Sequence, residues 1–295
     1  MRTLRRFGLI MEAVLGVVMA SDLAHAAGTT HTLATFDNGS LSQSGWLFGA
    51  QAGATLSVST DTSKNLNGSA GSLRATYPTP TGAVYAWATY SVASLATYDL
   101  YIEFWAKMPA AKQGLKFLKI FGRDNAGYAN TTFALDYTGA DYGSMYQVSF
   151  GDGSTAYNDT ANVINFDGSY PQWIGRSFGS ATVQTPMRRA FRSSDWGASW
   201  HKFRIRVKFN SGTNATNQTA DGAYYVEIDG NVYVNATGLF NRHYSNGPID
   251  RVELFGWSQS GTQPFEIWYD DVRISTGGFS DSAPGPKPPT DVTAN

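Results

Sequence analysis

Hydrophobic and polar residues alternate most regularly between Trp200 and Ile274. Polar loops separate four strand-like segments there: WHKFRIRVKFN, AYYVEIDGNVYVN, IDRVELFGW and FEIWYDDVRIS. In the first segment, every second residue from Phe203 to Phe209 is hydrophobic, and Lys and Arg occupy the positions between them. Successive side chains of a strand point to opposite faces, so this period of two predicts a sheet with one buried and one solvated face. The Asp-Gly pair at 229–230 predicts a hairpin.

The first half of the chain shows the same period. In DLYIEFWAKM, Leu100 and Ile102 alternate with Tyr101, Glu103 and Trp105. Further strands are predicted at 131–137 and 145–150, and no amphipathic helix exceeds two or three turns. Many short strands with regular turn signals predict an all-β fold, a two-sheet antiparallel β-sandwich.

The segment LKFLKIFGR is the next predicted strand. Its alternation places Leu118 and Ile120 on one face. Phe117, Lys119 and Phe121 then lie on the opposite face, followed by Arg123. We expect this strand to lie next to the DLYIEFWAKM strand, so that the outward residues of both form one surface.

Composition agrees with a turn-rich β protein. Charged residues make up 15% of the 295 residues, compared with about 25% in an average globular protein, and the chain holds 8 Trp, 16 Tyr and 17 Phe. One domain is predicted at 27–275, with a Pro- and Gly-rich tail or linker at 276–295. The absence of cysteine excludes disulfides and thiolate chemistry. A net charge of -1 favours neither nucleic acid nor a membrane surface as a partner.

The first 26 residues have the pattern of a secretory signal peptide. Arg2, Arg5 and Arg6 precede the mostly apolar stretch Phe7–Ala20, and Ala24-His-Ala26 matches a small-x-small cleavage site. The apolar stretch is shorter than the ~20 residues that a membrane-spanning helix needs. These features predict export, to the periplasm or the medium of a bacterium.

A family resemblance follows from LYIEFWAKM, LKFLKIFGR, the block SWHKFRIRVKFN…ADGAYYVEIDGNVYVN and the ending WYDDVRIS. Together they resemble the concanavalin A-like jelly rolls of bacterial polysaccharide lyases and laminin-G-like carbohydrate-binding modules. The resemblance covers roughly residues 35–275 and is a pattern of strands and turns rather than a catalytic signature. It implies a curved sandwich whose concave sheet cradles a sugar chain, and it implies secretion and a structural calcium ion.

Outward-facing aromatic and charged residues are the candidate sugar-binding groups. Aromatic planes stack on sugar faces, and cations pair with acidic sugars. The alternative is that these rings pack under loops or against the second sheet, since large rings bury well, whereas charges on the same face oppose burial. The predicted substrate-binding residues are Tyr101, Glu103, Trp105, Phe121, Gln147 and Trp257.

A lyase hypothesis rests on the loop that contains His243 and Tyr244. A lyase that cleaves uronates removes the proton α to a carboxyl group, which requires a base and a group that neutralises the carboxylate. His243 and Tyr244 are the candidate base and proton carrier, and Lys119 and Arg123 are the candidate neutralisers. The alternative is an ordinary polar loop.

Two other motifs carry less chemistry. Glu227-Ile-Asp229 resembles the E-x-D-x-E strand of retaining glucanases, but Gly230 follows and no second Glu arrives, so an Asp-Gly hairpin explains it better. The row of Lys and Arg at 202–208 is either a solvated sheet face or, on a concave side, a surface for an anionic glycan such as alginate or glucuronan.

Asp37 and Asp271 are the candidate calcium ligands. In jelly rolls of the kind that the chain resembles, the first and last strands meet at such an ion, and calcium prefers carboxylate and carbonyl oxygens. Asp270 lies on the other face of its strand, and turn capping explains these residues equally well. No organic cofactor is expected. The three histidines that follow the signal peptide lack the spacing of a zinc site.

Three functional hypotheses follow. The first is a secreted monomer that binds a polysaccharide on its concave sheet. The second is a polysaccharide lyase of the same fold that cleaves a uronic-acid-containing glycan by β-elimination. The third is a structural or adhesion module. The second predicts unsaturated uronate products, and the first predicts binding without them.

Overall fold

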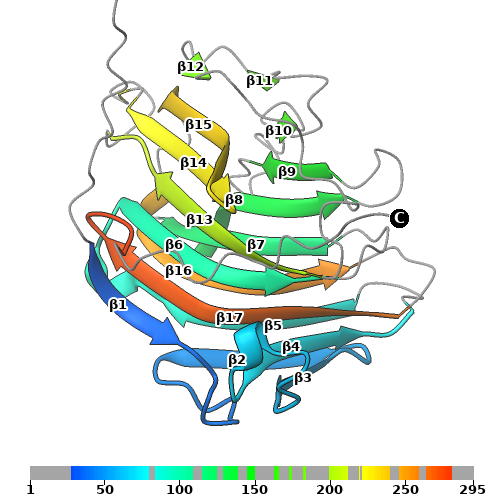
Figure 1. The fold of residues 1–295 in the computed structure, drawn as a ribbon. Coiled ribbons are helices and arrows are strands. Elements are labelled where there is room, and N and C mark those ends of the chain that lie inside the picture. Colours follow the sequence, from blue (N-terminus) through cyan, green and yellow to red (C-terminus); the bar gives the residue numbers. More distant parts are fainter. Residues whose placement is uncertain are drawn as a thin grey trace, which may run out of the picture.

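Two antiparallel sheets packed against one another form the protein (Figure 1). The computed structural model describes residues 28–79, 84–108, 115–124, 129–138, 145–149, 163–165, 173–174, 182–183, 199–211, 219, 221–239, 246–258 and 264–280. These ranges contain seventeen strands and two short 3-10 helices, Leu66–Gly68 and Ala93–Leu95. No helix within them is long and apolar enough to cross a bilayer.

The first sheet, called sheet A, has the strand order β12-β15-β14-β13-β6-β17-β4-β3, and β1 also pairs with β17. Its strands are β1 (Thr29–Ala34), β3 (Thr55–Ser59), β4 (Ser72–Tyr77), β6 (Asp99–Lys107), β12 (Thr182–Val183), β13 (Trp200–Lys208), β14 (Gly222–Ile228), β15 (Asn231–Leu239) and β17 (Phe265–Thr276). The first and last strands of the described chain are therefore neighbours in one sheet.

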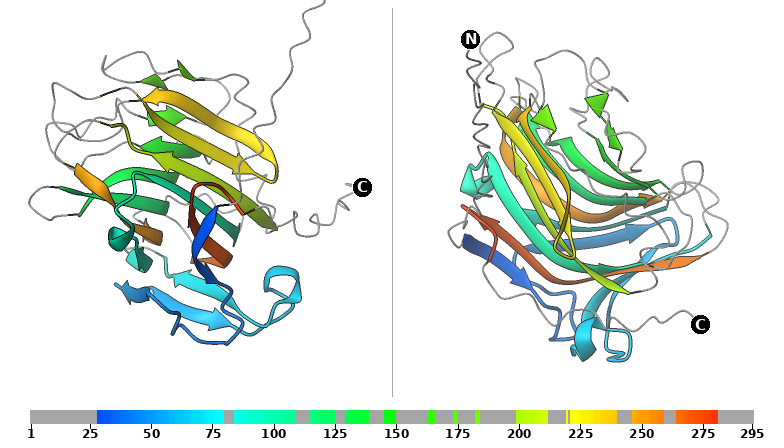
Figure 2. Two further views of the ribbon diagram at one scale, coloured as in Figure 1. Left: turned by 90° about the vertical axis from the view of Figure 1, so that its left-hand side faces the viewer. Right: turned by 45° about the horizontal axis from the view of Figure 1, so that its top comes forward.

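The second sheet, called sheet B, has the order β11-β10-β9-β8-β7-β16-β5-β2. Its strands are β2 (Trp46–Gln51), β5 (Val84–Ser91), β7 (Leu115–Asp124), β8 (Ala129–Thr138), β9 (Met145–Ser149), β10 (Val163–Asn165), β11 (Trp173–Ile174) and β16 (Asn246–Ser258). Figure 2 shows the two layers from two further directions. The predicted two-sheet antiparallel sandwich is confirmed.

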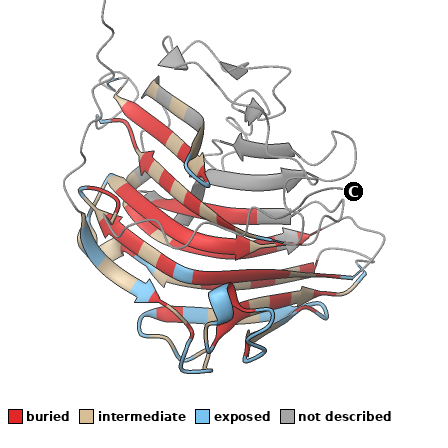
Figure 3. Ribbon diagram, in the orientation of Figure 1, coloured by how far each residue is buried: buried red, intermediate tan, exposed pale blue. Residues whose placement is uncertain are grey.

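Burial along β13 follows the predicted period of two. Phe203, Ile205 and Val207 are buried, and the cationic residues between them are half-buried (Figure 3). Strand β6 differs, because every residue from Leu100 to Ala106 is buried. Both faces of β6 are therefore covered, one by the core and the other by a different part of the chain.

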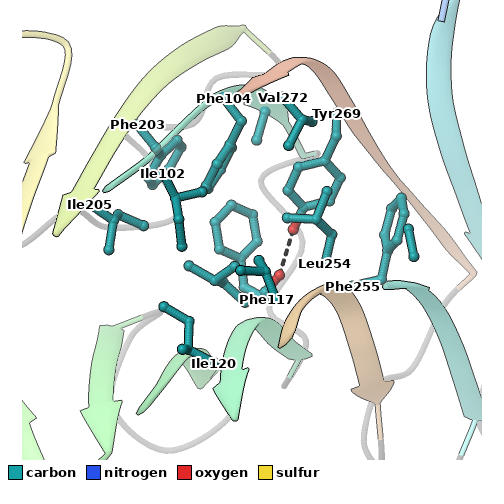
Figure 4. Close-up of a cluster of buried hydrophobic side chains, with 14 of the residues drawn as sticks. Ile102, Phe104, Phe117, Ile120, Phe203, Ile205, Leu254, Phe255, Tyr269 and Val272 are labelled. Atoms are coloured by element: carbon teal, nitrogen blue, oxygen red, sulfur yellow. Dashed lines mark hydrogen bonds between the residues drawn. The ribbon is translucent and has the colours of Figure 1, made fainter. Parts of the chain in front are cut away.

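Aromatic rings from both sheets fill the core (Figure 4). Phe104 and Phe203 of sheet A stack with their centroids 5.0 Å apart, and the Phe117 ring of sheet B lies 5.1 Å from that of Phe203. The Tyr269 hydroxyl donates a hydrogen bond to the Phe117 carbonyl oxygen at 2.7 Å. That bond satisfies a polar group in an otherwise apolar interior.

The position of Phe117 corrects the sequence prediction, which placed it on the same face as Lys119. The pairing of β7 with β8 shifts register between Lys116 and Leu118. An extra residue at such a bulge turns one side chain to the opposite face. Phe117 therefore points into the core together with Leu118, and the simple alternation begins only after it.

The expected neighbourhood of β6 and β7 is wrong. Strand β6 pairs with β13 and β17 in sheet A, whereas β7 pairs with β8 and β16 in sheet B. The outward residues Tyr101, Glu103 and Trp105 are therefore separated from Lys119 and Phe121 by the whole sandwich, in which the sheets pack about 10 Å apart. They do not form one surface.

Candidate functional site

The central strands of sheet B carry polar and aromatic side chains on the face away from the core. Leu118 of β7, Val252 of β16 and Ala86 of β5 are fully buried in the core cluster. The residues that alternate with them point outward. Six of these, called the sheet B cluster, are Tyr85, Trp87, Lys119, Phe121, Arg251 and Glu253. The register brings Lys119 opposite Glu253 and Phe121 opposite Arg251.

One carboxylate oxygen of Glu253 lies at the centre of the cluster. The Lys119 ammonium lies 2.6 Å from Oε1 of Glu253, and the Tyr85 hydroxyl donates a hydrogen bond to the same oxygen. The Lys119 ammonium also lies 3.4 Å from the Tyr85 oxygen. Only 11% of the Lys119 side chain and 5% of the Glu253 side chain are exposed. A buried charge is tolerated when it is paired and hydrogen-bonded, so these three groups form one interdependent network.

Burial, followed by the hydrogen bond to Glu253, raises the pKa of Tyr85 above its ordinary range. A nearby negative charge and a low local dielectric both disfavour the phenolate. At neutral pH the hydroxyl is therefore protonated, which suits Tyr85 to donate a proton rather than to abstract one.

Arg251 is the charged residue of the cluster that forms no ion pair among the described residues. Its guanidinium lies over the Phe121 ring, 4.1 Å from the centroid. Within the described part of the chain it pairs with no carboxylate, and its Nε atom is buried without a hydrogen-bond partner. Buried donors are nearly always paired in folded proteins. An arginine that is held on an aromatic ring with an unused donor can receive an anion.

No protein-family model matches this chain, and no curated protein matches its sequence. Solved structures do match. The endo-β-1,4-glucuronan lyase of the fungus Trichoderma reesei superposes with a TM-score of 0.55, covering 84% of this chain and 96% of that one, at 12% identity. The alginate lyase Aly36B superposes with a TM-score of 0.50, covering 86% of this chain and 100% of that one, at 13% identity. The fold is the jelly roll of these polysaccharide lyases. Identities this low show a common fold and nothing finer.

The jelly roll places the predicted site residues in three groups. Lys119 and Phe121 belong to the sheet B cluster. Arg123 of β7, Gln147 of β9 and Trp257 of β16 also lie in sheet B, and their backbones pair with Ala129, Asp136 and Tyr85, respectively. The side chains of these three, and the whole of His243 and Tyr244, lie outside the described residues.

The third group, Tyr101, Glu103 and Trp105, lies on the outer face of sheet A, and all three are buried. The chain's own C-terminal segment covers part of this face. The ring of Phe279 packs edge-on against Tyr101 at 5.0 Å. The backbone N–H and the hydroxyl of Ser280 each donate to Oε2 of Glu103 at 2.7 Å. The sequence left two alternatives for these residues, a sugar-binding surface or burial under another segment. The contacts of Phe279 and Ser280 agree with burial under another segment.

The cationic row of β13 is neutralised within the chain. Arg206 makes two hydrogen bonds to the Asp99 carboxylate, at 2.9 and 2.7 Å. Arg204 lies 3.3 Å from Glu103. Lys208 lies 3.3 Å from Asp221, and Lys202 lies 3.8 Å from Glu103. A row with this many internal partners offers little net charge to a glycan, in contrast to Arg251.

Glu227 and Asp229 are separated by the hairpin that the sequence predicts. Asp229 and Gly230 have φ values of 51° and 74° and connect β14 to β15. The Asp229 carboxylate lies 2.6 Å from Nδ1 of His201, whereas Glu227 lies 3.7 Å from Arg204. The two acidic groups have different partners, so this segment does not form a pair of glycosidase carboxylates.

Asp37 and Asp271 lie close enough to interact. Burial, and then the Asp37 carboxylate, raise the pKa of Asp271, which has a φ of 48°. The neighbouring Asp270 is buried and accepts hydrogen bonds from two serine hydroxyls. No group of three acidic, His or Cys side chains gathers within the described ranges. Calcium takes about six to eight oxygen ligands, so the two carboxylates fit only part of a site, and the ion stays a prediction.

Sequence reasoning missed Tyr85, Arg251 and Glu253. Their alternation is visible, because Arg251 and Glu253 alternate with hydrophobic residues in IDRVELFGW, and Tyr85 does so in AVYAWATYS. The missing information was the pairing of β5 and β7 on either side of β16, which brings residues 134 positions apart into contact.

Proposed function

We propose that the protein is a secreted polysaccharide lyase that cleaves a uronic-acid-containing glycan by β-elimination at the sheet B cluster. The observation that carries the proposal is the Arg251 guanidinium beside the Tyr85–Glu253–Lys119 network, without a carboxylate partner in the described chain. A guanidinium matches the geometry of a carboxylate, which a uronate supplies. The jelly-roll fold that the chain shares with glucuronan and alginate lyases agrees with this assignment.

We divide the chemistry between residues of the cluster and the base candidate from the sequence, His243, which lies outside the described residues. Arg251 binds the uronate carboxylate and neutralises its negative charge, which makes the C5 proton more acidic. The base predicted from the sequence, His243, takes that proton, and the electron pair forms the C4–C5 double bond as the bond from C4 to the glycosidic oxygen breaks. Tyr85 gives its hydroxyl proton to the leaving oxygen. A proton then passes from His243 to Tyr85, which restores the starting protonation state of both residues.

Lys119 has a different role from the one predicted from its position. Its ammonium is held 2.6 Å from Glu253, so its charge is already balanced before any substrate binds. It lies 3.4 Å from the Tyr85 oxygen, where it stabilises the phenolate that forms when the proton leaves. Arg251 takes over the role of carboxylate neutraliser, with Arg123 as a second candidate from the sequence.

The test is incubation with alginate, glucuronan and heparin-like chains, monitored by the ultraviolet absorbance of the unsaturated uronate. Arg251→Gln should lower kcat/KM by about a hundredfold, the loss typical of one transition-state contact. The matched control is Arg74→Gln. Arg74 also lies over an aromatic ring, 5.5 Å from the Trp268 centroid, but in sheet A and 3.6 Å from Glu266. Its substitution should leave kcat/KM unchanged.

The possible results separate the three hypotheses. Unsaturated product that depends on Arg251 and not on Arg74 supports the lyase. Retention of a uronic polymer without any product supports a binding protein of the same fold. A protein that neither binds nor cleaves these polymers contradicts both carbohydrate hypotheses and leaves the structural module. An Arg251→Gln enzyme as active as the wild type would place the site elsewhere.

A further inference from the structure

Trp87 of β5 extends over the edge strand of sheet B. Its neighbour across the pairing is Gly49 of β2, the outermost strand on this side. A Cβ atom at position 49 would lie 2.0 Å from Cζ2 of Trp87 and 2.4 Å from Cε2. Real side chains never approach so closely, so only glycine lets the indole lie against the backbone of β2. Glycine within a strand often marks such a close approach.

Within the sheet B cluster, the Trp87 indole extends the aromatic surface of Tyr85 toward the sheet edge. The rings of Tyr85 and Trp87 stack with their centroids 5.0 Å apart and their planes inclined by 24°. The hydroxyl of Tyr85 belongs to the Glu253 network, and Trp87 reaches the sheet edge, so one aromatic surface joins the two. Both rings are half-buried and therefore partly open to solvent.

The strand beneath the indole leaves this edge uncovered. Leu47 and Gln51 are the outward neighbours of Gly49 on β2, and both are exposed, with 72% of Leu47 accessible. An exposed leucine beside a partly open indole makes a small apolar surface next to polar groups. Pyranose rings have the same character, since their C–H faces pack on aromatic rings while their hydroxyls stay hydrated.

We infer that Tyr85 and Trp87 form a pyranose-binding subsite and that the polysaccharide crosses β16, β5 and β2 on its way to the sheet edge. The inference rests on the proposed function for its location, beside the reacting sugar. Tyr85 meets the bond that is cleaved, and Trp87 holds the next sugar residue by stacking. Longer glycans should therefore bind more tightly than fragments that end before β2.

The test measures binding and cleavage separately. Trp87→Ala should weaken retention in gels that contain alginate or glucuronan by about tenfold, which corresponds to about 1.4 kcal/mol. It should raise KM for the polymer more than KM for the shortest cleaved oligosaccharide. Trp87→Phe should keep most of the affinity, and Gly49→Val, which displaces the indole, should lose it. Trp200→Ala removes an indole of sheet A and should have no effect.

Each result bears on one of the two proposals. A wild-type protein that gives no unsaturated product but loses retention on Trp87→Ala keeps the subsite and contradicts the lyase. A folded Trp87→Ala protein with wild-type retention and KM overturns the subsite, as does a wild-type protein that neither gel retains. If Trp87→Ala does not fold, equal retention of the wild type and the Gly49→Val protein overturns it.

Discussion

Removing the Lys119 ammonium while keeping the length of the side chain, as in Lys119→Met, tests the network at the centre of the sheet B cluster. In the wild type, Oε1 of Glu253 has two partners among the described residues, the ammonium at 2.6 Å and the Tyr85 hydroxyl. After the substitution, the neutral hydroxyl is the one of these two partners that remains. The Glu253 side chain is 5% exposed, so water cannot replace the lost cation. The variant therefore leaves a buried charge uncompensated.

The size of the effect follows from this burial. Breaking a buried ion pair by removing one partner costs about 3–5 kcal/mol of unfolding free energy. The remaining Tyr85 hydrogen bond places Lys119→Met at the lower end, about 3 kcal/mol. Since 1 kcal/mol shifts the melting temperature of a domain of this size by about 2–4 °C, we expect a drop of roughly 10 °C. The double variant Lys119→Met/Glu253→Leu removes both charges and should stay within about 1 kcal/mol of the wild type.

Urea titrations of the wild type, both single variants and the double variant form a cycle that isolates the pair. Lys64→Met is the matched control, because Lys64 pairs with Asp61 at 3.5 Å on the surface, with side-chain exposures of 57% and 47%. It should leave the urea midpoint unchanged. A loss below about 1 kcal/mol for Lys119→Met would show that water screens the network, which contradicts a buried, uncompensated charge on Glu253.

Three further predictions concern sheet A. Burial raises the pKa of Asp270 to about 7 from 3.8, so stability should fall as pH rises from about 4 to 7, and Asp270→Asn should flatten that fall in urea titrations at each pH. The Phe279 side chain is 8% exposed, and its ring centroid lies 4.5 Å from the Arg204 guanidinium. Phe279→Ala should therefore lower the free energy of unfolding by about 3 kcal/mol, whereas Leu47→Ala, at an exposed position, should leave it almost unchanged. A chelator should lower the melting temperature and Asp271→Ala should abolish that effect; an unchanged melting temperature contradicts the calcium prediction.

Local periodicity was enough to predict the strands from β13 to β17, together with β6 and β7, but not β5, which carries Tyr85 and Trp87. The alternation from Phe203 to Phe209 determines the buried face of β13, and the Asp-Gly pair determines the hairpin after it. Phe117 was misplaced because a bulge depends on the partner strand, which the sequence of β7 does not reveal. Of the predicted candidates with described side chains, Lys119 and Phe121 alone share a face with Arg251, since the partners of a strand determine its sheet.

The sequence by itself determined the fold class, because the period of two and the turn residues act over a few neighbouring positions. The tertiary structure decided which outward faces meet. It joined β5, β16 and β7, so that Tyr85 and Lys119 share one carboxylate oxygen of Glu253. It also covered Glu103 with the chain's own C-terminal segment. Strand pairing across more than a hundred residues depends on the packing of the whole core, and no local pattern encodes it.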